Sequence, residues 1–209
     1  MAVIHRTTMS PTKLDLLTEW LPSRPWYRGA QRPRLAKAGG FRLDDPAGEV
    51  GIEFMVVTDD SGARPVTYHL PLTYRGAELP GGAHALVGTS EHGVLGLRRI
   101  YDGSHDPVAV AQIAALLSGN TQPQAQSASD TPDPSVVVTN PVSASDVAEF
   151  AVADGIDDTE IAVVGGPLLR VHRRLDPEAP PPGVTVTVTA PWRGTDDRVT
   201  RSVLLSAHH

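Results

Sequence analysis

The sequence contains no cysteine, few aromatic residues and no long apolar run. The absence of cysteine from all 209 residues excludes a disulfide framework, a thiol nucleophile and a cysteine zinc site. No apolar run approaches the roughly 18 to 20 residues that span a bilayer, and the first residues lack the hydrophobic core of a signal peptide. We therefore expect a cytoplasmic protein without a membrane segment.

Charge is unevenly distributed along the chain. The net charge is −6, yet residues 1–43 carry eight Lys or Arg against two acidic residues, and the remainder carries the acidic excess. The basic segment either lies against the acidic remainder or forms an edge that binds an anion or a partner. Nucleic acid is not an expected partner, because the chain as a whole would repel it.

The first half of the chain has the pattern of an antiparallel sheet flanked by two helices. Ser10-Pro11 is a typical helix start, and Pro22 ends that helix. Pro71 indicates that its strand lies at an edge or contains a bulge. Alternating or continuous apolar residues predict four strands, and Asp106 with Pro107 begins the second helix. The expected elements are a helix over 11–21, strands over 50–59, 65–75, 83–90 and 93–103, and a helix over 106–118.

A polar segment separates this half from a second unit. Residues 119–134 contain no large apolar side chain and are predicted to form a linker or mobile loop that buries nothing. In the second unit, Ser143 and Gly155 mark the two ends of a further predicted helix. The other expected elements are a strand over 134–140, a hairpin over 159–175 and a strand pair over 184–190 and 197–207.

These elements predict an α+β fold, in which a curved antiparallel β-sheet is packed by helices and a smaller β-rich unit follows. The predicted division is a domain over 1–118, a polar linker over 119–134 and a β-rich unit over 135–209.

An aromatic and basic run, "EWLPSRPWYRG", lies just after the first predicted helix. Its Trp20, Arg24, Trp26 and Tyr27 match a signature that opens the N-terminal cap domain of bacterial maltokinases. The stretches "LPLTYRGAE", "ALVGT" and "IYDGSHDP" follow in the order that this family uses. The resemblance covers about residues 13–118 and implies a cap-like domain.

The same run permits two interpretations of its side chains. Arg24, Trp26, Tyr27 and Arg28 could form a surface that binds a sugar face or an anion. Alternatively, the aromatic rings anchor the loop to the sheet and the arginines pair with acidic groups. We favour anchoring, and keep these four residues as candidate binding residues.

The second unit resembles the amino-terminal lobe of the same kinases. The stretch "DTEIAVVGGPLLRVHRRLDPE" (158–178) places Arg170 where the family has its phosphate-binding lysine. The catalytic-loop and metal-binding motifs of the family have no counterpart, and only 39 residues follow Arg170. The resemblance therefore implies a cap with a remnant of the first lobe, and not an active kinase. Arg170 remains a candidate anion-binding residue.

Other chemistry-bearing residues have structural explanations. Acidic pairs at 44–45, 59–60, 157–158 and 196–197 each fall at a predicted turn, where aspartate bonds its own backbone. The histidines have no metal-ligand spacing. The glycines of "VVGGPL" fit a turn rather than a phosphate loop. We expect no catalytic residue, no metal site and no cofactor.

Three functions are consistent with these features. The favoured one is a non-catalytic binding or regulatory protein of α-glucan, maltose or trehalose metabolism, whose partner is an enzyme of that metabolism. This link rests on the resemblance. The second is a small-molecule binding protein for a sugar phosphate or nucleotide, using the basic N-terminal segment and Arg170. The third is an unrecognised glucan-active enzyme.

Overall fold

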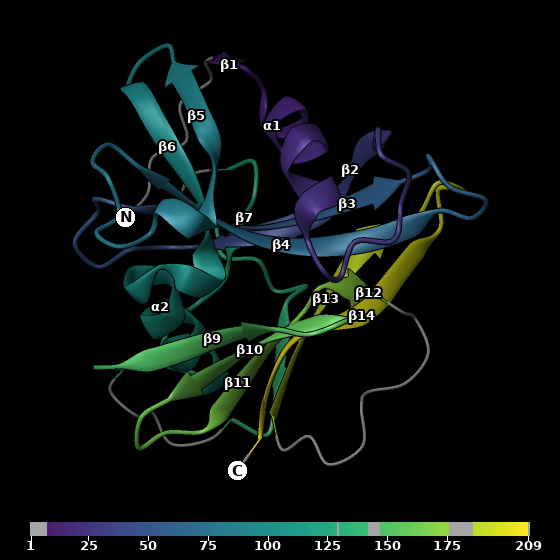
Figure 1. Cartoon of the computed structure of the whole chain (residues 1–209). Helices are drawn as coiled ribbons and strands as arrows, with labels where there is room; N and C mark the ends of the chain where they lie inside the picture. The colour runs from purple at the N-terminus through teal and green to yellow at the C-terminus, as the bar shows by residue number, and fades with distance from the viewer. Residues whose placement is uncertain (1–7, 129, 142–146, 176–185, 209) are drawn as a thin grey trace.

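The computed structural model describes residues 8–128, 130–141, 147–175 and 186–208 (Figure 1). Most elements are antiparallel strands, and two α-helices accompany them. The helices are α1 (Lys13–Trp20) and α2 (Pro107–Leu117). The strands are β1 (Met9–Ser10), β2 (Leu35–Leu43), β3 (Gly51–Asp59), β4 (Val66–Arg75), β5 (Leu86–His92), β6 (Gly96–Asp102), β7 (Gln124–Ala125), β8 (Val137–Thr139), β9 (Phe150–Asp154), β10 (Asp158–Val163), β11 (Leu168–His172), β12 (Arg174–Leu175), β13 (Val186–Arg193) and β14 (Val199–His208).

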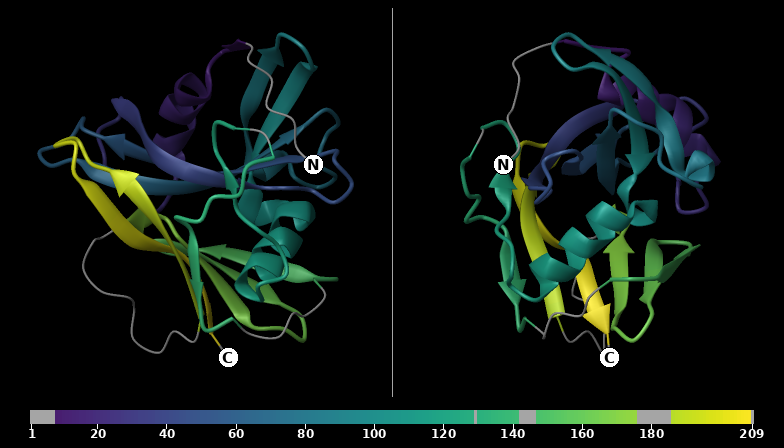
Figure 2. Two further views of the ribbon diagram at one scale, coloured as in Figure 1. Left: turned by 180° about the vertical axis from the view of Figure 1, so that it is seen from behind. Right: turned by 90° about the vertical axis from the view of Figure 1, so that its left-hand side faces the viewer.

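The strands form one open hydrogen-bonded sheet that folds into two layers. Its order is β1-β5-β6-β4-β3-β2-β13-β14-β11-β10-β9, with β12 on β4, β7 on β2 and β8 on β13. β2 meets β13 through a single residue pair, Gly39 with Trp192. The sheet turns at this point, so that β2–β4 form one layer and β9–β11 with β13 and β14 form the other (Figures 1 and 2).

Strand β3 divides the interior into two cores because its side chains alternate between faces. Ile52, Phe54 and Val56 face the main core, which also contains residues of α2, β10, β11, β13 and β14. Met55 and Val57 face the second core, beneath α1. Figure 1 shows α1 on the outer face of β3 and β4, and α2 between the two layers.

Helix α1 begins two residues later than the sequence pattern indicated. Its N-cap is Thr12, whose side chain accepts a hydrogen bond from the Asp15 amide while Asp15 bonds the Thr12 amide in return. This reciprocal capping box satisfies two free amides at the helix start, so Ser10 and Pro11 precede the helix. The predicted cap of α2 is confirmed, since Asp106 accepts a bond from the Val108 amide.

Pro71 is accommodated by a gap between the neighbours of β4. On one side β4 pairs along its length with β3, while on the other β12 pairs at Thr67 and Tyr68 and β6 pairs from Leu72 onward. The His69 amide donates to the Arg173 carbonyl on that second side. Alternate residues of a strand direct their amides to the same neighbour, so Pro71, which has no N–H, faces the gap.

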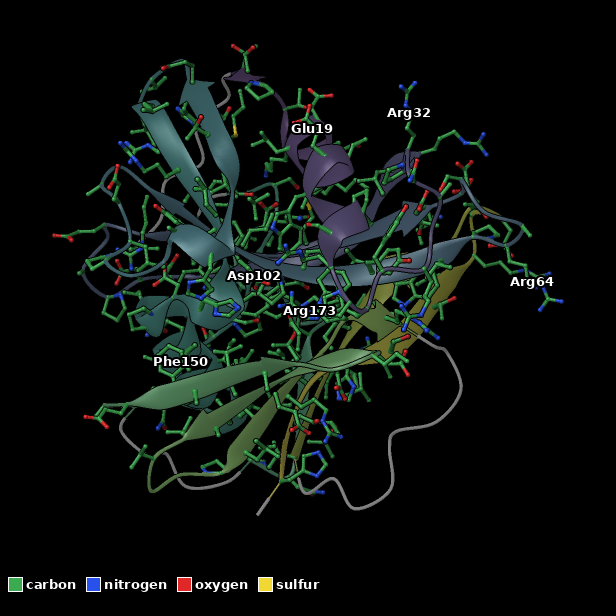
Figure 3. All side chains as sticks on the ribbon, in the orientation of Figure 1. Glu19, Arg32, Arg64, Asp102, Phe150 and Arg173 are labelled. Atoms are coloured by element: carbon green, nitrogen blue, oxygen red, sulfur yellow. The ribbon has the colours of Figure 1, made fainter. Side chains whose placement is uncertain are left out.

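A buried ion pair joins the two layers. Arg173 has 0% exposure, and its Nη2 lies 2.6 Å from Oδ2 of Asp102, at the end of β6. Nη2 also donates to the Ser104 hydroxyl, and Nε donates to Thr159 of β10 at 2.7 Å. Figure 3 shows Arg173 and Asp102 in the interior between the layers. Burial raises the pKa of the Asp102 carboxyl, but the Arg173 charge and hydrogen bond outweigh it, and the pKa is lowered.

The fold class is therefore β-rich and largely antiparallel, rather than the predicted α+β arrangement. The helix predicted over 143–155 is wrong where the structure describes it, because Phe150–Asp154 is strand β9 and pairs with β10. Residues 143–146 of that prediction lie outside the described residues. Strand β2 was not predicted from the sequence.

The segment 119–134 is packed against the sheet, contrary to the expectation that it buries nothing. Gln124 is buried in β7 and pairs with Arg42 of β2, and Gln126 bonds the buried Glu53. The Gln126 amide is accommodated through its hydrogen bond to Glu53, a contact that a count of apolar residues does not register. The division into a domain, a linker and a second unit stays a prediction, although strands of both units share one sheet.

Candidate functional site

Trp26, the first candidate, lies in the second core. Its side chain is fully buried, with its ring centroid 5.8 Å from that of Trp20 and 6.0 Å from that of Tyr68. The Arg173 guanidinium lies 4.9 Å from the same ring, within the range of a cation–π contact. These contacts favour the anchoring interpretation for Trp26.

Tyr27 continues the anchor toward the end of β3. Its hydroxyl lies 2.7 Å from Asp59 Oδ2, and its ring centroid lies 5.5 Å from that of Tyr68. Burial, followed by the hydrogen bond to Asp59, raises the pKa of the Tyr27 hydroxyl. The Tyr68 hydroxyl accepts a bond from the Arg28 amide, so this part of the run is fixed by side chains of β3 and β4.

The two arginines of the run contact the protein's own groups. The Arg24 guanidinium lies 4.8 Å from the Trp20 ring. Arg28 donates to the carbonyls of Pro25, at 2.7 Å, and Ile156, at 3.1 Å. Among the described residues, the partners of these arginines are an aromatic ring, the Ser23 hydroxyl and backbone carbonyls, and not the acidic groups that the sequence suggested. A binding role for these residues stays a prediction.

Arg170 lies on β11 and faces two carboxylates of β10. Its Nε lies 3.1 Å from Asp158 Oδ2, and its Nη2 bonds Glu160 Oε1. Glu160 is directly opposite Arg170 in the strand pair, where opposite charges attract across a sheet. The structure thus places Arg170 in an ion-pair network rather than beside the aromatic run.

A cavity of about 900 Å³, lined by both apolar and charged residues, opens at the start of α1. We call it the α1 cavity; α1, β2–β4, the β5–β6 hairpin and the segment around Gln126 contribute its walls. Its charged lining residues are Lys13, Lys37, Arg42, Asp45, Glu49, Glu53 and Arg98. None of the five candidate residues from the sequence lines it.

Glu53 of β3 is the centre of a hydrogen-bond network in this cavity. Its carboxylate is buried and accepts bonds from Lys13 Nζ at 2.7 Å, from the Tyr74 hydroxyl and from Gln126 Nε2 at 2.8 Å. Burial raises the pKa of Glu53, but the Lys13 charge and these three hydrogen bonds outweigh it, and the pKa is lowered. Burial also raises the pKa of Tyr74, with the Glu53 charge adding to it. Glu53 is therefore ionised and Tyr74 is neutral near pH 7.

The basic N-terminal segment supplies much of the cavity's positive charge. Lys13, Lys37 and Arg42 all belong to residues 1–43 and meet Arg98 of β6 there. The basic excess of residues 1–43 had indicated an edge that binds an anion or a partner. The sequence alone did not show which residues of that segment would line such a site. Glu53 gave no signal, because one acidic residue in an apolar strand also fits an exposed position.

Neither a metal site nor a membrane-spanning helix is present in the described part of the chain. Over the described ranges, no group of three or more His, Asp or Glu side chains is arranged to hold a metal ion. His84 and His105 form a pair with 3.1 Å between Nε2 and Nδ1, but without a third ligand. No helix in the described part of the chain is long and apolar enough to cross a bilayer.

The fold and cavity define a β-rich domain with an aromatic anchor beneath its first helix and a cavity with apolar and basic lining residues beside it. Residues 20–106 match the family model described as the maltokinase N-terminal cap domain. This match confirms the cap-like domain predicted from the motifs. No curated protein matches the chain.

The Glu53 network predicts that two glutamine substitutions lower the free energy of unfolding by different amounts. Gln126→Ala removes the donor to Glu53 Oε1 and should lower the free energy of unfolding by about 1–3 kcal/mol, because a buried charge loses a hydrogen bond. The control, Gln122→Ala, truncates an exposed residue four positions away and should change it by less than about 0.5 kcal/mol. Urea denaturation measures both, and equal effects would contradict the role given to Gln126.

Proposed function

We propose that this chain is a non-catalytic binding or regulatory protein of maltose, trehalose or α-glucan metabolism. The match of residues 20–106 to the maltokinase cap domain is the observation that carries this proposal. The structure adds a sheet with two cores and a cavity lined by apolar and charged residues, which suits a domain that binds rather than one that only links. The proposed partner is an enzyme of that metabolism, in the cytoplasm.

The surroundings of Arg170 support the absence of kinase activity. Phosphoryl transfer depends on charges positioned around the β- and γ-phosphates. At the position that resembles the kinase lysine, the Arg170 guanidinium is already paired with Asp158 and Glu160. A phosphate would have to displace these carboxylates or bind beside their negative charge. The planar guanidinium also does not replace a compact ammonium in a fitted site.

We therefore expect no ATP-dependent phosphorylation of sugars. Purified full-length chain with ATP, Mg²⁺ and maltose, glucose, glucosamine or trehalose should consume ATP at the background rate. Arg170→Ala, which removes the paired guanidinium, should give the same rate. Turnover above background in the unchanged chain, lost in Arg170→Ala, would show that the chain is a kinase and would contradict the proposal.

The proposed link to sugar metabolism predicts that a partner enzyme binds the chain. Tagged full-length chain purified from its native cells should retain an enzyme that converts maltose, trehalose or α-glucan. The purified enzyme and the purified chain should then co-elute in size-exclusion chromatography and separate in high salt if charge holds them together. Retention only of enzymes that act on other substrates, or failure of the purified pair to co-elute, would contradict the link.

A further inference from the structure

We propose that the α1 cavity is a binding site for a phosphorylated sugar. The proposal rests on the proposed function in taking the chain to be a non-catalytic binding protein, and it assigns to that function a site and a class of ligand. Four properties of the cavity support it: its size, the balance of its charges, one buried donor without a partner, and the hydrogen-bonding groups of the Glu53 network.

The size of the cavity fits a small carbohydrate. Its volume of about 900 Å³ lies within the range of about 300–1,000 Å³ that is usual for small-molecule sites. Its walls come from segments far apart in the chain, from Met9 to Gln126. A ligand there would contact α1, the sheet, the β5–β6 hairpin and the packed segment around β7 at the same time.

Most of the cavity's carboxylates already have partners. Glu53 is bonded to Lys13, and the Asp45 carboxylate accepts bonds from the backbone amides of Ala47, Glu49 and Val50. These bonds hold the turn between β2 and β3. Glu49 is the remaining lining carboxylate, and it lies at an exposed position.

The lining carries four cations, Lys13, Lys37, Arg42 and Arg98, against the three carboxylates, an excess of one positive charge. Within the described residues, the Lys37 side-chain ammonium has no hydrogen-bond or ion-pair partner. The Arg42 guanidinium donates to the carbonyls of Ala125 and Ala128. Arg98 donates to the Leu95 carbonyl. Carbonyl groups satisfy the donors of a guanidinium but do not neutralise its charge. The cavity therefore has a local excess of positive charge on a protein whose net charge is −6.

Arg98 also has an unused donor. Its Nε is buried and has no hydrogen-bond partner among the described residues. An unsatisfied buried donor costs free energy, and a charged donor is best satisfied by an anion. Phosphate oxygens accept several charge-assisted bonds at once, which suits an arginine that lines the same cavity as Arg42 and Lys37.

The Glu53 network provides groups that suit sugar hydroxyls. Lys13 donates one of its three ammonium hydrogens to Glu53, Gln126 uses one amide hydrogen, and the Tyr74 oxygen retains acceptor capacity. A sugar hydroxyl both donates and accepts, so it can bond such a mixed set. Hydroxyls at this network and a phosphate near Lys37, Arg42 and Arg98 would use both parts of the cavity.

Isothermal titration of the full-length chain tests the ligand class. Glucose 1-phosphate and glucose 6-phosphate are the sugar-phosphate probes, with glucose, inorganic phosphate and AMP as comparisons. We expect saturable binding of at least one sugar phosphate, at least about tenfold tighter than glucose or phosphate, because each lacks one set of contacts. Absence of binding by both sugar phosphates, or equal binding by inorganic phosphate, would overturn the proposal. Tighter binding of AMP would assign the cavity to nucleotides instead.

A matched pair of charge reversals tests the location. Lys37→Glu should weaken binding of the sugar phosphate at least about tenfold. Arg64→Glu makes the same change of charge at the exposed turn between β3 and β4, where Figure 3 shows Arg64 directed away from the body. It should leave the affinity within about twofold, since charges beyond about 8–10 Å are screened at physiological salt. Equal losses in both variants would refute this location.

The neutral variant Lys37→Gln provides a second measurement if Lys37→Glu is unstable. It should also weaken binding, but less than the reversal, and unchanged affinity would overturn the assignment of Lys37. These titrations need no partner enzyme and no turnover. Failure of the ligand to bind would therefore leave the tests of kinase activity and partner enzyme unaffected, and a failed partner test would leave the titrations intact.

Discussion

The buried contact between Arg173 and Asp102 constrains the arrangement of the whole molecule. A guanidinium removed from water is costly unless its charge and its donors are satisfied. Asp102 supplies the opposite charge from β6, Thr159 accepts from β10, and Trp26 covers the guanidinium face from the aromatic run. Among the described residues, Nη1 alone of the three guanidinium nitrogens has no hydrogen-bond partner. These partners come from three distant parts of the chain, so the contact can form only when both layers and the run are in place.

The main chain reinforces this constraint. The Arg173 carbonyl accepts from the His69 amide of β4, and the Arg173 amide donates to the Asp157 carbonyl. The short strand β12 then pairs with β4 directly after Arg173. The aromatic run noticed in the sequence thus has a physical explanation: Trp26 completes the surroundings of a buried cation. The contacts of Arg173 and β12 with β4 help to hold β4 in its layer, and β2–β4 of this layer all line the α1 cavity.

Sequence patterning located the elements whose signals are local. The alternation of β4, the apolar run of β3, the Asp106 cap and the hairpin at Gly165-Gly166 are all recovered in the structure. Strand β2 was missed because "LAKAGGFRL" contains two glycines and two alanines, which disfavour strands, and pairing with β3, β7 and β13 outweighs that preference. The predicted helix over 143–155 failed because cap-like residues at its ends were given more weight than the alternating Phe150 and Val152 inside it.

The candidate site was less accessible to sequence reasoning. The basic segment was recognised: Arg34 pairs with Asp60 of the acidic remainder, while Lys37 and Arg42 line the α1 cavity, where binding of an anion or a partner stays a prediction. Glu53 and Arg173 were not singled out, because burial of a charge depends on contacts across the fold. Arg170 attracted attention through the resemblance, although Arg173, three residues later, is the buried arginine.

A double-mutant cycle on Arg173 and Asp102 tests the central claim most directly. The free energy of unfolding would be measured by urea denaturation for the unchanged chain, Arg173→Met, Asp102→Asn and the double variant. Each single change should cost about 3–5 kcal/mol, because it leaves one buried group without its partner. The double variant should cost at least about 2 kcal/mol less than the two single losses together. Additive losses, within about 0.5 kcal/mol, would show that the two layers do not depend on this contact.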